Sequence, residues 1–548
     1  MTTQSKKLRI VMGQLNLLVG DVEGNITKLI DAAARARDEL HADLILFPEL
    51  AITGYPPEDL LLRAGLYERI AAGISRLQQA ITGITVVVGL PQRVDGCTYN
   101  ALLAISDGVI QATTHKRFLP NYGVFDEKRY FSSDTAPPGI IEVNGFKLAL
   151  LICEDIWHAE PAKEAAEQGA ELLLVANASP YHQAKGSRRV DVVKQRVQEV
   201  ALPVVYTNLV GGQDELVFDG GSFVVDAQGA VQQQVPYFEE GLFVAEFSRT
   251  NEGLKSLRGI SQPRFCDERN VYRALVLGVR DYIEKNGFSG AVLGLSGGID
   301  SALTLAIAVD AIGADRVEAV MMPSRYTADM SSEDAAQEAE TLGVDYRVIT
   351  IEPLYDAFIN SLADEFAGTE VDTTEENLQA RCRGVLLMAI SNKKGKIVLT
   401  TGNKSEMAVG YATLYGDMAG GFAVLKDVPK MLVYRLSKYR NSISPVIPQR
   451  VIDRPPSAEL APDQKDQDSL PPYDVLDAIL ERYVEQEQCV DEIIAAGFDA
   501  QTVKRVIRLV DLNEYKRRQA APGVRITQRA FGRDRRYPIT SAYNRQWR

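Results

Sequence analysis

The stretch AVLGLSGGIDSALTLAIAVDAIG, residues 291–313, sets the architecture of the second half of the chain. The apolar run AVLGL predicts a buried strand, and the apolar residues after Asp300 predict a helix. Ser296, Gly297 and Gly298 stand between them. Glycine lets backbone N–H groups approach phosphate oxygens, and a helix N-terminus adds partial positive charge. The stretch therefore predicts a nucleotide-binding turn, although it lacks the GxxxxGK[ST] pattern of a Walker loop.

The string SGGIDS resembles the signature of the ATP pyrophosphatases, enzymes that split ATP into AMP and pyrophosphate while adenylating a substrate. This resemblance implies a doubly wound parallel sheet that binds an adenine nucleotide. The downstream segments EENLQARCRG (375–384), LTTGNKSEMAVGYATLYGDMAG (399–420) and PPSAEL (455–460) resemble the NAD synthetase branch of that superfamily. The residues that the resemblance assigns to ATP are Ser296, Gly297, Gly298, Asp300, Ser301, Arg381 and Thr401.

The same resemblance implies an acceptor site and a metal site. It places Asn377, Asp417 and Lys430 near a dinucleotide or its adenylated carbonyl. It also assigns Asp300 and Glu406 to Mg²⁺, because oxygen ligands suit a magnesium ion that bridges to pyrophosphate oxygens. The implied cofactor is therefore Mg²⁺, with ATP as co-substrate.

Three segments of the first half carry chemically useful side chains. Cys153 directly follows the apolar run LALLI, so we expect it at the carboxyl end of a buried strand, where catalytic residues often stand. Glu49 ends the apolar segment DLILFPE, and a poorly solvated carboxylate suits a general base. Lys116, in THKRFLPNYG, supplies a cation that favours a thiolate and neutralises an oxyanion.

Taken together and in this order, the three segments resemble the catalytic set of the nitrilase, or carbon-nitrogen hydrolase, superfamily. The resemblance implies an αββα sandwich in which Cys153 attacks an amide carbon, Glu49 moves the proton and Lys116 stabilises the intermediate. Glu127 resembles the supporting second glutamate of that family. The family positions for glutamine recognition fall on Tyr55, Tyr122, Glu154, Trp157, Ser179 and Lys185. Some members carry Arg where Lys185 stands, and a lysine lacks the bidentate fork of a guanidinium.

The hydrophobic periodicity predicts two α/β domains. The first spans residues 1–247, with many buried strands and a helix capped by Asn25. Residues 248–269 lose the periodicity and predict a linker. The second domain spans 270–548 and begins with a helix that is apolar at Val271, Leu275, Val279 and Ile283. Residues 454–472 are Pro-rich and acidic, and predict a mobile segment or lid.

Composition excludes several classes of protein. The chain has 548 residues, 46% of them apolar and 24% charged, with a net charge of −13, so we expect a globular protein that binds neither nucleic acid nor membrane. Five dispersed cysteines predict a reducing cytoplasm. The end of the chain, 504–548, is basic, with 13 Lys and Arg against three acids. It predicts either a solvated surface or a contact with anions or an acidic domain.

An amidase placed before an ammonia-consuming adenylating domain resembles the glutamine-dependent NAD synthetase family over essentially the whole chain. The expected substrates are nicotinate adenine dinucleotide, ATP and glutamine, and a homo-oligomer is expected. Two alternatives stay open. A related amidotransferase would aminate a nucleobase or aspartate, whereas an amidase regulated by a nucleotide-sensing domain would bind ATP without forming products.

Overall fold

The computed structural model describes residues 6–183, 185–250, 253–261, 267–461 and 464–543. The chain divides into two compact units, Met1–Phe265 and Cys266–Arg548, and each is described here by itself. Among the described residues, no helix combines the length and the apolar character that crossing a membrane requires.

The described residues of unit 1 form two large sheets and four α-helices. In spatial order, the first sheet consists of β15 (Gly253–Ser256), β14 (Gly241–Thr250), β1 (Lys7–Gln14), β2 (Leu44–Leu46), β3 (Thr85–Val94), β4 (Cys97–Ser106) and β5 (Val109–His115). The second consists of β13 (Val231–Gln234), β12 (Phe223–Val225), β9 (Val204–Asn208), β8 (Leu172–Asn177), β7 (Phe146–Ile152) and β6 (Ile140–Val143). The remaining elements are the ribbon β10 (Val210–Gln213) and β11 (Leu216–Asp219), and the helices α1 (Val22–Asp38), α2 (Ala64–Ala80), α3 (Ala159–Glu167) and α4 (Lys185–Val200).

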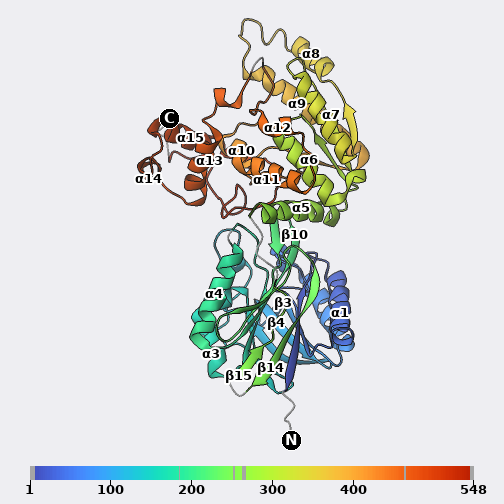
Figure 1. Ribbon diagram of the computed structural model, residues 1–548, viewed down its shortest axis with the longest axis vertical. Helices are drawn as coiled ribbons and strands as arrows, with labels where there is room; N and C mark the ends of the chain where they lie inside the picture. The colour runs from blue at the N-terminus through green and yellow to red at the C-terminus, as the bar shows by residue number, and fades with distance from the viewer. Residues whose placement is uncertain (1–5, 184, 251–252, 262–266, 462–463, 544–548) are drawn as a thin grey trace. The chain divides into compact units, whose positions relative to one another are not determined.

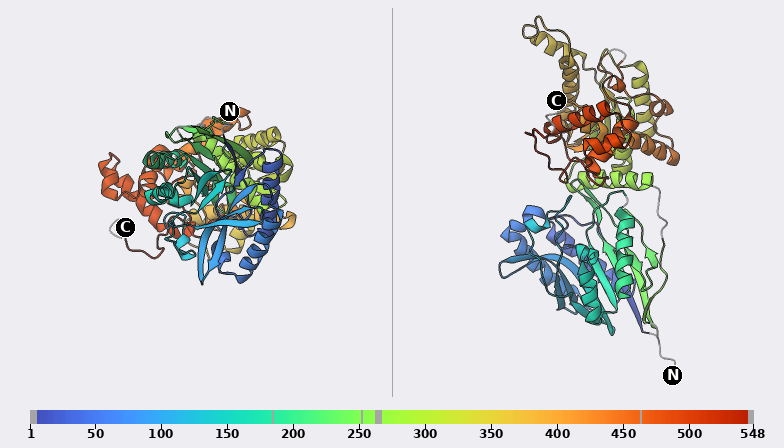
Figure 2. Two further views of the ribbon diagram at one scale, coloured as in Figure 1. Left: turned by 90° about the horizontal axis from the view of Figure 1, so that it is seen from below. Right: turned by 90° about the vertical axis from the view of Figure 1, so that its left-hand side faces the viewer.

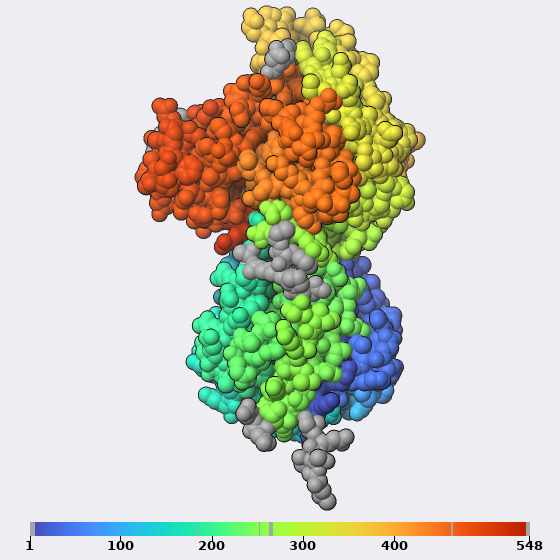
Figure 3. Space-filling model, viewed as in Figure 1, coloured from blue at the N-terminus to red at the C-terminus, as the bar shows by residue number. Residues whose placement is uncertain are grey.

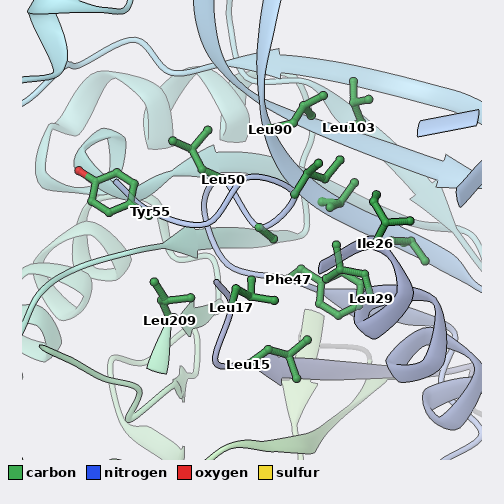
Figure 4. Packing of buried hydrophobic residues seen from close by; sticks show 14 of the residues in the cluster. Leu15, Leu17, Ile26, Leu29, Phe47, Leu50, Tyr55, Leu90, Leu103 and Leu209 are labelled. Atoms are coloured by element: carbon green, nitrogen blue, oxygen red, sulfur yellow. The ribbon is translucent and has the colours of Figure 1, made fainter. Parts of the chain in front are cut away.

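The two sheets stack face to face between pairs of helices. Along β1, Ile10 and Met12 share one buried cluster with Leu148 of β7, whereas Val11 points the other way into a cluster with Ile26 of α1. This alternation follows from the period of two in a strand, and both faces are apolar because both are covered. Figure 1 shows α1 on one side of the sheets and α3 and α4 on the other, and Figure 4 shows the packing on the α1 side. The predicted αββα sandwich is confirmed.

Two boundaries in unit 1 differ from the sequence prediction. Helix α1 begins at Val22 and is capped by Asp21, whose carboxylate accepts the Gly24 N–H at 3.0 Å. Asn25 lies inside the helix, where its amide donates to the Leu18 carbonyl at 2.8 Å and so fastens the preceding loop. At the other end of the unit, β14 continues to Thr250 and pairs with β15, so backbone hydrogen bonds extend the sheet into residues 248–250 and 253–256. Residues 251–252 and 262–266 of the predicted linker lie outside the described residues.

Unit 2 is built on one parallel sheet. Its order is β18 (Asp345–Val348), β17 (Val317–Met321), β16 (Ala291–Gly294), β19 (Ile397–Thr400) and β20 (Phe422–Ala423). The chain first runs from β16 outward to β18 and then crosses back to β19 on the other side of β16. The topological switch therefore lies between β16 and β19, and ligands of doubly wound sheets bind beyond the carboxyl ends of such strands. The predicted doubly wound sheet is confirmed.

Helices cover this sheet and form a C-terminal cluster. They are α5 (Asp267–Lys285), α6 (Ile299–Ile312), α7 (Asp329–Leu342), α8 (Glu352–Ser361), α9 (Thr373–Lys394), α10 (Lys404–Val409), α11 (Lys430–Ile443), α12 (Gln449–Asp453), α13 (Tyr473–Leu480), α14 (Val490–Ala495), α15 (Ala500–Leu512) and α16 (Glu514–Arg517). Helix α9 packs on the sheet through Cys382 and Leu387. Figure 2 shows the yellow segment around α8 extending from the rest of unit 2, and Figure 3 shows the orange and red segments of the unit packed against one another.

The basic C-terminal segment is partly internal to unit 2. Arg517, Arg525 and Arg535 are each at most 5% exposed. Arg535 pairs with Glu514 at 2.6 Å, and Arg525 pairs with Asp534 at 2.8 Å. These three arginines therefore contribute neither the solvated surface nor the anion contact that the sequence predicts, because the few acids of the same segment neutralise them.

Candidate functional sites

Cys153 occupies a strained turn at the end of β7. The residue has φ = 45° and opens the 3₁₀ turn Cys153–Trp157, and its side chain is 4% exposed. A left-handed conformation at a non-glycine residue is unfavourable and is typical of functional positions. Burial, together with the Glu49 carboxylate, raises the pKa of the Cys153 thiol well above its usual value, although Lys116 opposes this shift. The thiol is therefore protonated at rest and needs a base to become a nucleophile.

Lys116 joins two carboxylates beside this cysteine. Its ammonium is fully buried and donates to Glu49 Oε1 at 2.7 Å and to Glu127 Oε1 at 2.8 Å. Burial alone would lower the pKa of Lys116, but Glu127 and Glu49 outweigh burial and raise the pKa well above its usual value. The side chain therefore remains a cation, and a buried cation near a thiol suits the stabilisation of an oxyanion.

Each carboxylate of this centre has its own support. Asn100 donates to Glu49 Oε1 at 2.7 Å, and the Ala178 N–H donates to Glu49 Oε2 at 3.0 Å. The Tyr55 hydroxyl donates to Glu127 at 2.9 Å. Burial raises the pKa of Glu127 to about 7 even though Lys116 opposes this shift. The first half thus brings together all four residues named for catalysis or its support.

Sequence reasoning missed Asp155, which connects the segment of Lys116 to the segment of Cys153. Its carboxylate accepts the N–H groups of Arg117 and Phe118, both at 3.0 Å, and that of Ile152 at 3.2 Å. Three backbone donors therefore fix the segment that carries Lys116 against the turn that carries Cys153. The position of an acidic residue two places after the cysteine was a signal in the sequence that could have indicated a role for it. The sequence alone, however, predicts neither its burial nor its hydrogen-bond partners.

The predicted glutamine-binding residues separate into two groups. Tyr122 donates to Glu154 at 3.1 Å, and the Lys185 ammonium lies 4.4 Å from the centre of the Trp157 ring. The Glu154 carboxylate raises the pKa of Cys153, and the charge of Cys153 raises the pKa of Lys185. These four residues therefore form one group near the nucleophile.

The other two residues are buried in the framework around that group. Tyr55 is 5% exposed and is committed to Glu127. Ser179 is 3% exposed, and its hydroxyl accepts the Arg189 Nε–H at 3.0 Å. Arg189 in turn pairs with Asp219 at 2.7 Å, so these residues hold the walls of the site in place.

In unit 2, the predicted phosphate loop lies between β16 and α6. Gly297 has φ = 76°, and a Cβ placed there would lie 2.2 Å from the Ser331 carbonyl oxygen, so only glycine fits. The Ser301 hydroxyl donates to the Gly298 carbonyl at 2.9 Å and lies 3.1 Å from the Ser296 hydroxyl. These side chains brace the loop at the N-terminus of an apolar helix, which is a suitable place for an anion.

Asp300 and Glu406 both contact one cation. Lys430 is 1% exposed, and its ammonium donates to Asp300 and, at 3.3 Å, to Glu406. Asn403, which the sequence analysis did not single out, donates to Asp300 at 2.9 Å and caps α10. Burial raises the pKa of Glu406 to about 8 against the opposing effect of Lys430. The two carboxylates follow the adjacent strands β16 and β19, as the switch point requires.

The remaining predicted residues form a second group in unit 2. Thr413 connects Asn377 and Asp417, because its hydroxyl donates to the Asn377 side-chain oxygen and its N–H donates to Asp417, both at 2.9 Å. Burial raises the pKa of Asp417 to about 6. Arg381 donates to the Leu414 carbonyl at 3.3 Å, in the same loop. Thr401 is half-buried and directly follows β19. Of the three residues predicted to bind the dinucleotide, Asn377, Asp417 and Lys430, only Lys430 contacts the predicted metal ligands Asp300 and Glu406 among the described residues.

The Pro-rich acidic segment, residues 454–472, contacts the phosphate loop. Arg454 donates to the Gly297 carbonyl at 2.7 Å, and Glu459 accepts the Ser331 hydroxyl at 2.6 Å. Asp466 is 3% exposed and accepts the Tyr473 hydroxyl at 2.8 Å. Residues 462–463 lie outside the described residues.

Comparison with known proteins gives a family for each of the two units. The carbon-nitrogen hydrolase family model matches residues 9–253, and the NAD synthase family model matches residues 271–520. A glutamine-dependent NAD(+) synthetase of Xanthomonas campestris pv. campestris is 51% identical over 544 residues, covering 98% of each chain. One from Thermotoga maritima is 44% identical over 578 residues, covering 98% of this chain and 99% of its own.

Solved structures extend the likeness to three dimensions. The structure of glutamine-dependent NAD+ synthetase from Acinetobacter baumannii in complex with adenosine diphosphate is 48% identical. It has a TM-score of 0.80 and covers 97% of this chain and 98% of its own. That of Cytophaga hutchinsonii has a TM-score of 0.85 at 23% identity over 99% of each chain, a likeness that concerns the fold alone.

The fold and the sites together define an enzyme with an amide-hydrolysing unit of the carbon-nitrogen hydrolase class and a nucleotide-binding unit of the NAD synthase class. The chain belongs to the glutamine-dependent NAD(+) synthetase family. It is a ligase that takes nitrogen from glutamine, and its two units fit a glutaminase and an ATP-dependent amidation.

Proposed function

We propose that the chain converts nicotinate adenine dinucleotide to NAD+ with nitrogen from glutamine, releasing glutamate, AMP and pyrophosphate. One observation carries the proposal: a single chain contains two buried lysine-carboxylate centres, one beside a cysteine and one at a phosphate loop. The first suits amide hydrolysis and the second suits adenylation. Near neutral pH most free ammonia is protonated, and the ammonium ion is not a nucleophile. Making ammonia on the same polypeptide offsets this loss because it raises the effective concentration of ammonia at the acceptor.

In the glutaminase step, Cys153 Sγ attacks the carboxamide carbon of glutamine while Glu49 takes the thiol proton. Lys116 stabilises the tetrahedral oxyanion, and Glu127 holds Lys116 in place. As the intermediate collapses, the C–N bond breaks and the proton on Glu49 passes to the departing ammonia. Water then attacks the thioester, again with Glu49 as base, and glutamate leaves.

Tyr122, Glu154, Trp157 and Lys185 are proposed to hold the amino acid end of glutamine. The Glu154 carboxylate suits the α-ammonium, and the Lys185 ammonium suits the α-carboxylate. Ser179 and Tyr55 act through their neighbours, as their burial and their hydrogen bonds indicate.

In the amidation step, the carboxylate of nicotinate adenine dinucleotide attacks the α-phosphorus of ATP, and pyrophosphate leaves. Ammonia then displaces AMP from the adenylate. The phosphate loop from Ser296 to Ser301, with Arg381 and Thr401, is proposed to hold ATP. Asn377 and Asp417 are proposed to hold the dinucleotide. Lys430 would neutralise charge at the reacting carboxyl group.

The donor set of Asp300 and Glu406 fits Mg²⁺. Among the described residues no group of three or more His, Cys, Asp or Glu could form a complete metal cage. Magnesium is commonly held by one or two carboxylates plus phosphate oxygens, so two carboxylates at a phosphate loop suffice. When bound, the ion would neutralise charge on the pyrophosphate leaving group.

The proposal includes three coarser points. The glutaminase domain is assigned to residues 1–247 and the synthetase domain to 270–548, with 248–269 between them. The enzyme is expected to act in the cytoplasm and to form a homo-oligomer. Exposed apolar side chains on α9, Val385 at 61% and Met388 at 38%, support a surface available for association.

One incubation tests the function. The purified chain is mixed with ATP, Mg²⁺, glutamine and nicotinate adenine dinucleotide, and NAD+, AMP and glutamate are measured together. The proposal requires equal amounts of NAD+ and AMP, and no AMP when the dinucleotide is omitted. AMP formation with aspartate or a nucleobase acid in its place would favour a different amidotransferase, and ATP binding without AMP would favour a nucleotide sensor.

A further inference from the structure

Two cations, Lys185 and Arg188, lie on the first turn of α4, at the predicted glutamine site (helix α4 in Figure 1). The Lys185 ammonium lies 4.4 Å from the centre of the Trp157 ring, and the Arg188 guanidinium carbon lies 5.4 Å from it. Among the described residues, neither side chain has a hydrogen-bond or ion-pair partner. Lys185 is nevertheless 8% exposed, which is unusual for an unpaired lysine.

Electrostatic neighbours place this pair beside the nucleophile. The charges of Cys153 and Glu154 raise the pKa of Lys185, and the charge of Arg188 lowers it. Arg188 also acts on the Tyr122 hydroxyl, which donates to Glu154. The two cations and the Glu154 carboxylate therefore lie near one another, and charges of both signs suit a zwitterion.

The adjacent arginine provides a contrast. Arg189 is 2% exposed and is fully committed to Ser179, Pro180 and Asp219. Its charge is therefore compensated inside the protein. Arg188 is exposed and has no ion-pair partner among the residues that the structure describes, so it is the guanidinium on this turn that is available to a ligand.

We propose that Arg188 is a second binding residue for the α-carboxylate of glutamine and acts together with Lys185. This inference rests on the proposed glutaminase function and adds to it a residue that determines substrate specificity. A lysine alone offers a point charge, whereas a guanidinium offers the planar fork that a carboxylate accepts in bidentate fashion. Trp157, beneath both cations, would keep them oriented.

A lysine and an arginine together also bind a carboxylate over a wider pH range than a lysine alone. Burial and the neighbouring Arg189 lower the pKa of Lys185 to about 8. The ammonium is therefore partly lost as the pH rises through this value, and the attraction for the carboxylate weakens. An arginine remains charged over the same pH range, so Arg188 would still attract the carboxylate of glutamine after Lys185 has lost its proton.

The test compares three variants of the full-length enzyme in a glutamate-release assay. Arg188→Met keeps the packing on Trp157 but removes the charge, and Arg188→Lys restores a charge. Lys194→Met, on the same helix, is the control. We expect Arg188→Met to raise the KM for glutamine about tenfold with little change in kcat, the size expected for losing a charge-assisted hydrogen bond. We expect Arg188→Lys to recover part of that loss and Lys194→Met to match the parent enzyme.

The pH dependence separates binding from a structural role. In Arg188→Met the KM for glutamine should rise with pH as Lys185 loses its proton, more steeply than in the parent enzyme, because only Lys185 remains. The rise should begin somewhat above pH 8, because Arg188 itself helps to lower the pKa of Lys185. A parent-like KM in Arg188→Met, or a pH profile parallel to that of the parent, would overturn the inference. Because KM does not depend on the folded fraction, a poorly folding variant is still informative. If the parent enzyme itself releases no glutamate, the failure lies with the proposed function and not with Arg188.

Discussion

Replacing Glu127 with glutamine tests whether Lys116, the proposed oxyanion-stabilising residue, depends on its second carboxylate. Lys116 Nζ lies 2.8 Å from Glu127 and 2.7 Å from Glu49, with all three side chains at most 5% exposed. Glutamine keeps the shape and can still accept one hydrogen bond, so the change removes the charge alone. Because the hydrogen bond remains, the loss is the difference between a charged and a neutral hydrogen bond, about 1 kcal/mol, which corresponds to about fivefold in rate. We therefore expect kcat/KM for glutamine to fall about fivefold in Glu127→Gln.

The pH dependence of glutamate release gives a second test of the role of Glu127. Burial raises the pKa of Glu127 to about 7, so the carboxylate is charged above this pH and neutral below it. Glutamate release by the parent enzyme should therefore fall as the pH drops through about 7, and this acidic limb should be absent in Glu127→Gln. Initial rates of glutamate release from pH 5.5 to 8.5 measure both effects. A variant within twofold of the parent, with the same acidic limb, would refute the role assigned to Glu127.

Three further predictions follow from the two centres. Cys153→Ala should abolish NAD+ formation from glutamine while formation from ammonium salt survives, and equal loss with both nitrogen donors would show that the two activities are not separable. Glu406→Ala should reduce AMP formation by about 100-fold, as expected when charge stabilisation is removed, and unchanged AMP formation would remove Glu406 from the site. Lys404 is buried between Asp427 at 2.9 Å and Glu485 at 2.7 Å, so Lys404→Met should lower the free energy of unfolding by about 3 kcal/mol. Urea unfolding measures this loss, and an unchanged midpoint would contradict it.

The motifs and the strand pattern were sufficient to predict both folds and the residues to examine. The apolar runs before Cys153 and before Ser296 had to be strands covered on both faces, because no alternating polar face was present. Glycine at position 297 was a local requirement, since its positive φ and its approach to Ser331 admit no side chain. Such features depend on neighbours along the chain, and periodicity reports them directly.

Contacts between residues far apart in the chain were not predictable in this way. Asp155 fixing the Lys116 segment, Asn403 holding Asp300 across 103 positions, and the unpaired state of Arg188 all depend on which elements meet in three dimensions. The same holds for pKa values, because burial is a property of the assembled core rather than of a residue type. The chain thus determined the kind of chemistry through local pattern, whereas the tertiary structure decided which charges are paired, which are free, and therefore which side chains are available to a substrate.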